Sequence, residues 1–150
     1  MRISNEIDYG LRAMIVIASH QETLLSSKEI SRQYCIPYNF LTLILPRLVK
    51  AQLIVSHQGP KGGYQLNKAA DQISVFDIIT ALGTPIEISP CNTEKGCKLA
   101  EIFSLSKIWV ALNKQIDAYL LDVTLDQVVL DSEKLKQIQK IGEQEPVCRF

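Results

Sequence analysis

The feature that most constrains the fold is a change of hydrophobic period between residues 26 and 66. Ser26 and Glu29 have the spacing of a capping box, in which each side chain satisfies a backbone N–H of the other residue, and they open a short helix over residues 27–34. Pro37 marks the end of this helix, because proline disfavours helical geometry in the residue before it. Apolar residues at helical spacing then predict another helix over residues 38–50.

The period becomes that of strands soon after residue 50. Residues 53–56 and 64–66 are typical of two short strands, and the stretch between them, HQGPKGG, is rich in turn formers. An amphipathic helix over residues 5–19 precedes the whole unit. Helix, helix, turn, helix and hairpin is the order of a winged helix-turn-helix. We therefore predict a mainly α fold with a two-stranded wing.

The second half of the chain is predicted to contain a long helix. Ser74 caps a helix that ends before Gly83, and a loop over residues 84–98 follows. The long helix is expected at about residues 99–121, with apolar positions that alternate in steps of three and four, as in a coiled coil. These positions are Ile102, Leu105, Trp109, Leu112, Ile116 and Tyr119. We expect this C-terminal helix to dimerise with a second copy; the alternative is that it packs back on its own subunit.

The end of the chain is predicted to be less regular. Thr124 caps a short last helix, and residues 132–150 are so polar and charged that we expect a flexible tail.

Composition places the chain among ordinary globular proteins, with 47% hydrophobic and 21% charged residues in 150. Its first residues mix charge into an apolar pattern, and they contain neither a signal-peptide core nor the roughly 20 apolar residues of a membrane span. We therefore expect a cytoplasmic protein without a membrane partner. In that compartment four cysteines are more typical of thiols, metal ligands or redox sensors than of structural disulfides.

The charge is unevenly distributed although the chain as a whole is neutral. Residues 1–70 hold eight Lys and Arg against four acids, and the remaining residues hold eight against twelve. A basic half can supply the electrostatic footprint for duplex DNA without a basic isoelectric point.

The helix over residues 38–50 is the expected reader of DNA in the major groove. Asn39 suits adenine and Thr42 suits a thymine methyl group, whereas Arg47, Lys50 and Lys61 suit phosphates. The full set of expected DNA contacts is Lys28, Tyr38, Asn39, Thr42, Arg47, Lys50, His57, Gln58 and Lys61. His57 is equally compatible with a solvated loop histidine, and the trihelical unit with a module that binds protein and not DNA.

The stretch SSKEISRQYCIPYNFLTLILPRLVKAQLIVSHQGPKGGYQL resembles the DNA-binding region of IscR/NsrR-type bacterial regulators, the Rrf superfamily. MRISNEIDYGLRAM, ISVFDIITAL and the Cys-x5-Cys loop that runs into a helix with Trp109 are similar as well, so that the resemblance covers roughly residues 1–130. It implies a homodimeric transcription regulator with crossed long helices and a wing near the minor groove.

The chain departs from that family at three places. Gln58 stands where many relatives have an arginine that enters the minor groove, and Gln52 replaces a common glycine. Cluster-binding relatives have three cysteines in the central loop, whereas this loop has Cys91 and Cys97 only.

The resemblance implies that this loop senses an iron–sulphur cluster, redox state or nitric oxide. We expect Cys91 and Cys97 to hold a cluster, of the [2Fe-2S] type, with a ligand other than cysteine. Asp8 is the favoured extra ligand, because some relatives recruit an acid at this place from the partner subunit; Glu101, Cys35 and Cys148 are the others. A reversible disulfide across CNTEKGC and a loop that has lost its sensing role remain alternatives. Cys35 itself is expected to be a small buried apolar residue.

No motif in the sequence indicates an enzyme. It contains no GxxxxGK or HExxH motif, and its two histidines form no Ser/His/Asp set. We therefore expect a DNA-binding domain (1–83), a cysteine-containing sensor loop (84–98), dimerisation helices (99–131) and a flexible tail (132–150), and no catalytic residue.

Overall fold

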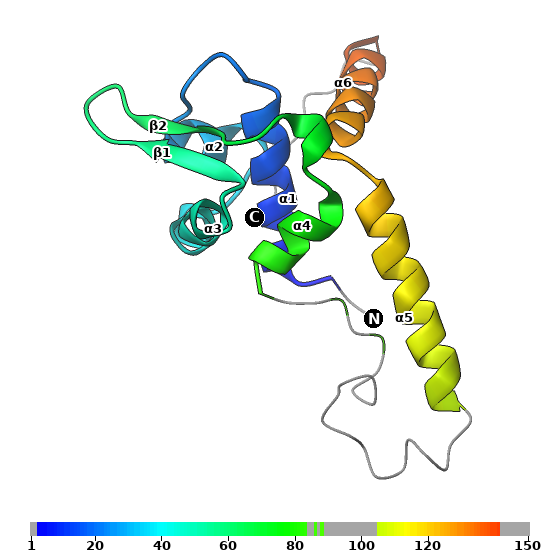
Figure 1. The fold of residues 1–150 in the computed structure, drawn as a ribbon. Coiled ribbons are helices and arrows are strands. Elements are labelled where there is room, and N and C mark those ends of the chain that lie inside the picture. The colour runs from blue at the N-terminus through cyan, green and yellow to red at the C-terminus, as the bar shows by residue number, and fades with distance from the viewer. Residues whose placement is uncertain (1–2, 84–85, 87, 89–104, 142–150) are drawn as a thin grey trace.

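The computed structural model describes residues 3–83, 86, 88 and 105–141 (Figure 1). Helix α1 (Asn5–Ala18) lies at the centre and packs against α2, α3, α4, α6 and strand β2. Its N-terminus is capped by Ser4, whose hydroxyl accepts a hydrogen bond from the N–H of Ile7 at 3.3 Å. Several consecutive turns of α1 are buried, including Ala13, Met14 and Ile17, because other elements cover it on more than one face.

Helices α2 (Ser27–Gln33) and α3 (Tyr38–Lys50) form the predicted helix-turn-helix. The capping box of Ser26 and Glu29 is present in full, so α2 begins where the sequence predicts. The turn between the helices contains Cys35 in the left-handed region, with φ of 53°. Helix α3 continues through Pro46, and its buried face is the one expected: Leu41, Ile44, Leu45 and Leu48.

Strands β1 (Ile54–His57) and β2 (Gly63–Leu66) pair antiparallel to form the predicted wing, with Ile54 opposite Leu66. The base of the wing is fixed to the segment before α2, since Leu25 and Tyr64 exchange two backbone hydrogen bonds of 3.1 and 2.8 Å. Gly63 permits this approach, because a Cβ there would lie 2.7 Å from the Leu25 carbonyl oxygen.

The C-terminal elements begin with a short 3₁₀ helix, η1 (Ala70–Gln72), and helix α4 (Val75–Ala81), which Ser74 and Asp77 open with a second capping box. Helices α5 (Leu105–Asp122) and α6 (Leu125–Ile141) follow. Their junction is fixed to the start of α4, because the N–H of Val75 donates to Val123 and the N–H of Leu125 donates to Ile73. A small apolar cluster of α1 and α4 extends the contact to Leu120 of α5.

Two boundaries differ from the predictions. The first residues of the expected helix over residues 99–121 lie outside the described part of the chain. Helix α6 continues to Ile141, past the end expected at residue 131, so part of the expected flexible tail is helical. Residues 132–141 are mostly Glu, Lys, Gln, Leu and Ile, and the long unbranched side chains among them favour helix even where the segment is polar.

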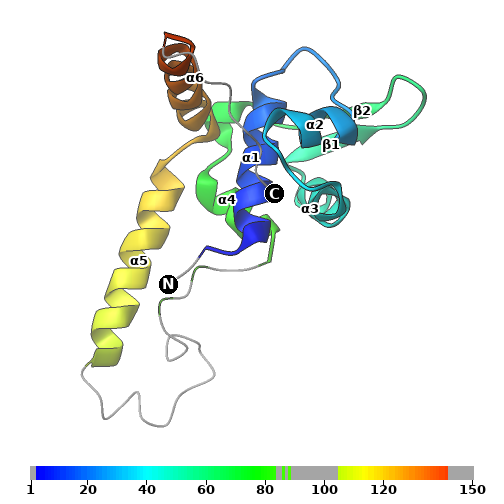
Figure 2. The ribbon, with the colours of Figure 1, turned by 180° about the vertical axis from the view of Figure 1, so that it is seen from behind.

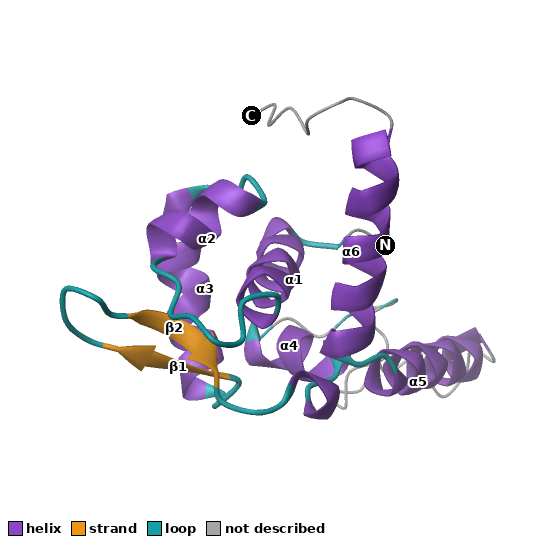
Figure 3. Ribbon diagram, turned by 90° about the horizontal axis from the view of Figure 1, so that it is seen from above, coloured by secondary structure: helices purple, strands orange, loops and turns teal. Residues whose placement is uncertain are grey.

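The wing and α3 lie on one side of the molecule, and α5 and α6 lie on the other (Figures 1 and 2). The view from above shows the same separation, with α1 between the two sides (Figure 3). In the parts that the structure describes, no helix is long and apolar enough to cross a membrane. The fold is thus mostly helical with one two-stranded sheet, as predicted.

Candidate nucleic-acid interface

Helix α3 presents a continuous exposed face opposite its buried one. Tyr38 and Leu43 are exposed by 51% and 53%, and Asn39, Thr42 and Pro46 are exposed as well. The apolar stripe of α3 is held in the core between α1 and the wing, so that this second face is directed away from the molecule. A rigid helix with an exposed mixed polar face has the shape that enters a DNA major groove.

Two polar side chains on this face differ in what they already contact. The Thr42 hydroxyl donates to the Asn39 carbonyl at 2.7 Å, which satisfies the hydroxyl within the helix and leaves its methyl group available for an apolar contact. The Asn39 side chain is exposed in the first turn of α3. The N-cap residue of the helix, Pro37, supplies no side-chain cap, and the N–H of Phe40 donates to the Pro37 carbonyl at 3.0 Å.

The wing presents the other expected contacts. Gln58 and Lys61 are exposed at its tip, where Gly59 has φ of 115° and its carbonyl accepts from Gly62 at 3.0 Å. His57 is exposed in β1, and its Nε2 lies 3.0 Å from Nε2 of Gln65 across the hairpin. His57 is therefore oriented by a neighbour and is not a freely rotating loop histidine.

A shallow groove lies between the wing and the start of α2, and the hydroxyl-bearing residues Ser26, Ser27 and Ser56 line part of it. Lys28 is exposed one residue further along α2. Hydrogen bonds from the side chain and then the backbone of Ser26 lower the pKa of Glu29, so its carboxylate stays ionised as part of the capping box.

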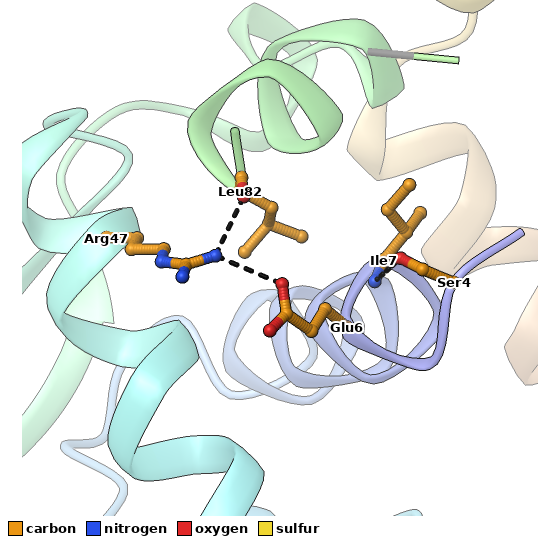
Figure 4. Close-up of polar contacts among 5 residues, drawn as sticks. All are labelled: Ser4, Glu6, Ile7, Arg47 and Leu82. Carbon is orange, nitrogen blue, oxygen red and sulfur yellow. Dashed lines mark hydrogen bonds and ion pairs between the residues drawn. The ribbon is translucent and has the colours of Figure 1, made fainter. Parts of the chain in front are cut away.

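Arg47 and Lys50 share the last turns of α3 but have different surroundings. Lys50 is exposed. Arg47 is directed back toward the body of the protein, where its Nη1 donates to Glu6 Oε2 at 3.1 Å and to the Leu82 carbonyl at 2.9 Å (Figure 4). One nitrogen of this guanidinium is therefore already engaged within the subunit.

Only one of the three expected cluster ligands lies within the described residues. Asp8 is half-exposed on α1, and its Oδ2 lies 2.7 Å from Nη2 of Arg12, one turn further along the helix. Arg12 also donates to the carbonyl of Tyr34 at 3.3 Å. Cys91 and Cys97 lie outside the described residues, and among the residues that are described no three His, Cys, Asp or Glu side chains gather as a metal site.

Cys35 differs from its expectation. It is half-buried where we expected a buried apolar residue, and it is disulfide-bonded. The remaining cysteines all lie outside the described part of the chain.

Helix α5 leaves an apolar face uncovered. The exposed large apolar residues on it are Ile108, Trp109, Val110, Leu112, Tyr119 and Leu121. Three of the predicted seam positions are among them, whereas Ile116 is half-buried and Leu120 packs against the domain. The C-terminal end of α5 therefore contacts its own subunit, and its remaining apolar face has no partner within the described residues.

Three contacts that organise this surface are not apparent from the sequence. Glu6 and the Leu82 carbonyl meet Arg47, Arg12 joins Asp8 to the turn before α3, and Leu25 holds the wing. The contacts of Arg47, of Leu25 and of Arg12 with the Tyr34 carbonyl join segments far apart in the chain, so no local spacing reveals them. The Asp8–Arg12 pair alone has a local, i,i+4 spacing.

Comparisons with known proteins agree with this arrangement. The model of the Rrf2 family, described as an iron-dependent transcriptional regulator, matches residues 3–131. The HTH-type transcriptional regulator IscR of Erwinia tasmaniensis is 33% identical over 136 residues, which cover 90% of this chain and 82% of the relative.

Solved structures of similar fold include two regulators. IscR from T. potens has a TM-score of 0.72 and 28% identity over 90% of both chains. CymR, the global cysteine regulator of B. subtilis, has a TM-score of 0.69 and 27% identity over 86% of this chain and 96% of that one. The predicted winged-helix fold and the predicted class of DNA-binding transcription regulators are thereby confirmed. The chain belongs to the Rrf2 family of DNA-binding transcription regulators.

Proposed function

We propose that this regulator binds a pseudo-palindromic operator as a homodimer, with α3 of each subunit in the major groove and each wing beside the adjacent minor groove. The observation that supports this proposal most is that α3 and the wing lie on the same side of the molecule, and α5 lies on the opposite side (Figure 1). A dimer joined through α5 can then present both DNA-reading surfaces outward. Since its partner is chromosomal DNA, its place is the cytoplasm.

The base-reading residues are those at the exposed start of α3. Asn39 offers a side-chain amide that can pair with both acceptor and donor atoms of adenine, and the Thr42 methyl can contact a thymine methyl. Tyr38 is 51% exposed beside them and adds contact area against the sugar-phosphate backbone.

The backbone contacts come from Lys28, Lys50 and Lys61, which are exposed on α2, on α3 and at the wing tip. Lysine neutralises phosphate as a point charge and carries no sequence information. Gln58 and His57 lie on the wing, where an amide or imidazole can hydrogen-bond acceptors in the minor groove. Gln58 itself reads the groove by hydrogen bonding and not by charge, and the cation of the wing tip is Lys61, which is assigned to a phosphate.

Dimerisation uses the uncovered face of α5. An exposed run of large apolar residues on a helix of 18 residues marks a protein interface, because a monomer would leave it in water. The exposed Trp109, Leu112 and Tyr119 lie, together with the half-buried Ile116, at steps of three, four and three, which suit packing against the same helix of a second copy.

The sensor of this regulator is the loop that contains Cys91 and Cys97, and its ligand is a [2Fe-2S] iron–sulphur cluster. The family description as iron-dependent supports an iron ligand. Thiolates are soft ligands that suit iron, whereas a carboxylate would bind one iron more weakly and leave it accessible to oxidants and nitric oxide.

Asp8 fits the role of that carboxylate. Its described partner is Arg12 in an exposed i,i+4 ion pair, with both side chains more than 40% accessible. Such pairs contribute only about 0.3–0.5 kcal/mol, so that moving the carboxylate to a metal costs little. The cluster would join the sensor loop to α1 of the DNA-binding domain, and this connection would depend on iron and on the redox state.

A thiol switch is the second candidate, and the disulfide at Cys35 favours it. Cys35 lies in the turn directly before α3, so a change in its bonding would act on the start of the recognition helix. Thiol counting in reducing and oxidising buffer, together with the DNA affinity of Cys35→Ser in both, separates this switch from a cluster.

The experiment for DNA recognition compares Lys61→Ala with Asn39→Ala on a selected operator duplex and on a random duplex. Lys61→Ala should weaken binding to both and reduce the slope of log affinity against log salt by about one. Asn39→Ala should relax discrimination at one base pair by about 1–3 kcal/mol and leave the salt slope unchanged. Identical behaviour of the two variants on both duplexes would contradict the assignment of α3.

A further inference from the structure

Arg47 joins three elements that are distant in sequence. Its Nη1 donates to Glu6 Oε2 in the first turn of α1 at 3.1 Å and to the Leu82 carbonyl at the end of α4 at 2.9 Å (Figure 4). The side chains of Arg47 and Glu6 are 44% and 32% accessible, so this group lies at the rim of the core.

Both acceptors are held in place by their own packing. Leu82 is fully buried, and it lies against Gly10 of α1, where a Cβ would come within 2.4 Å of Leu82 Cδ1. Glu6 stands in the first turn of α1, which Ser4 caps through the N–H of Ile7 (Figure 4). The acceptors are therefore part of the rigid body, and Arg47 binds the last turn of α3 to it.

We propose that Arg47 is a positioning residue for DNA recognition, which fixes the orientation of α3 on the body of the protein and does not neutralise a phosphate. The proposal rests on the proposed function of α3 as the recognition helix. Its reason is geometric: Arg47 fixes the C-terminal end of the helix whose N-terminal end carries Asn39 and Thr42. A tilt at one end of a rigid helix of 13 residues displaces the side chains at the other end.

The sign of the Glu6 effect distinguishes this role from a phosphate contact. Glu6 is an acid, so its removal makes the protein more positive and should strengthen DNA binding if only charge matters. If Glu6 acts through Arg47, its removal should weaken specific binding instead.

The test measures binding by fluorescence anisotropy across a salt series, with a duplex selected by the wild-type protein from a random library and a random duplex of equal length. Arg47→Met should weaken specific binding about tenfold with an unchanged salt slope. Glu6→Ala should weaken it about threefold, because the bond to Leu82 remains, and the double variant should be no weaker than Arg47→Met alone. Glu6→Gln keeps an acceptor and should stay near wild type.

Two matched controls accompany these variants. Lys50→Ala, from the same turn of α3, should reduce the salt slope by about one, as a phosphate contact does. Glu22→Ala removes the same charge as Glu6→Ala from an exposed position near α6 and should leave specific binding unchanged. Thermal unfolding of every variant should stay close to wild type, since an accessible ion pair stabilises little.

Two results would overturn the inference. A reduced salt slope in Arg47→Met with unchanged or tighter binding by Glu6→Ala would make Arg47 a phosphate contact. Unchanged affinities with a lowered unfolding temperature would make the group purely structural. If Arg47→Met folds poorly, Arg47→Lys and Glu6→Ala can be compared with the wild type in the same binding and salt-slope measurements. A wild-type protein that does not discriminate the two duplexes would instead overturn the proposed function itself.

Discussion

The N–H of Leu53 donates to the carbonyl of Leu48 at 3.1 Å and closes the C-terminus of α3 around Gln52. The N–H of Gln52 donates to Val49 at 2.9 Å, and Gln52 has φ of 59°, in the left-handed region. This pair of bonds is the Schellman motif, in which glycine is favoured at the left-handed position because it has no Cβ. The glutamine therefore adopts a conformation that costs it energy.

Gln52→Gly should stabilise the protein by about 0.5–1 kcal/mol, because relief of the left-handed strain exceeds the added freedom of the unfolded chain. The unfolding temperature should rise by roughly 1–4 °C at equal protein concentration. Ala51→Gly is the matched control, since Ala51 has φ of −77° and gains nothing from glycine. A loss of stability in Gln52→Gly equal to that in Ala51→Gly would contradict this prediction.

A charge on the uncovered face of α5 should disrupt the dimer. Leu112 is 39% exposed in the single chain, and Leu112→Glu would bury an unpaired carboxylate in the proposed interface. Sedimentation of the wild-type protein should give about twice the chain mass of 16.8 kDa. Sedimentation of Leu112→Glu should show a large fraction of monomer. Lys107→Glu, on the exposed surface of the same helix, should remain dimeric. A wild-type monomer at micromolar concentration would refute the interface.

Anaerobic purification should yield a coloured protein with iron and acid-labile sulphide. Cys91→Ala and Cys97→Ala should lose the colour, because each removes a thiolate ligand, and Asp8→Ala should bind the cluster less firmly. Cys148→Ala serves as the control and should keep the colour. A protein that stays colourless after reconstitution would eliminate the cluster. If Cys91→Ala also left DNA affinity unchanged in reducing and oxidising buffer, a thiol switch at this loop would be eliminated too.

The local elements could be predicted from the sequence because their signals are local. Ser26 with Glu29 and Ser74 before Asp77 place the starts of α2 and α4, and the turn residues between His57 and Gly63 place the wing. The length of α6 differs from the expectation, because in residues 132–141 the helix propensity outweighs the polarity that indicated a flexible tail.

The surroundings of the candidate site were not predictable in the same way. Arg47 looked like any other exposed cation near the end of the recognition helix, and its bonds to Glu6 and Leu82 exist only because α1 and α4 fold against α3. Only the resemblance indicates Asp8 as a ligand, and its pairing with Arg12 is seen in the structure, although the i,i+4 spacing permits it.

A dimer that presents two α3 helices to one face of duplex DNA requires a fixed distance between the two half-sites, and a series of operator spacings measures that distance. Two copies of the selected half-site are placed in one duplex with their centres separated by steps of one base pair, and the affinity of the wild-type dimer is measured for each. Binding should be tightest near one helical turn, about 10 base pairs or 34–36 Å, and should weaken sharply when about five base pairs are added, because the second half-site then faces away from the dimer. Affinity that does not depend on the spacing would contradict this arrangement of the dimer.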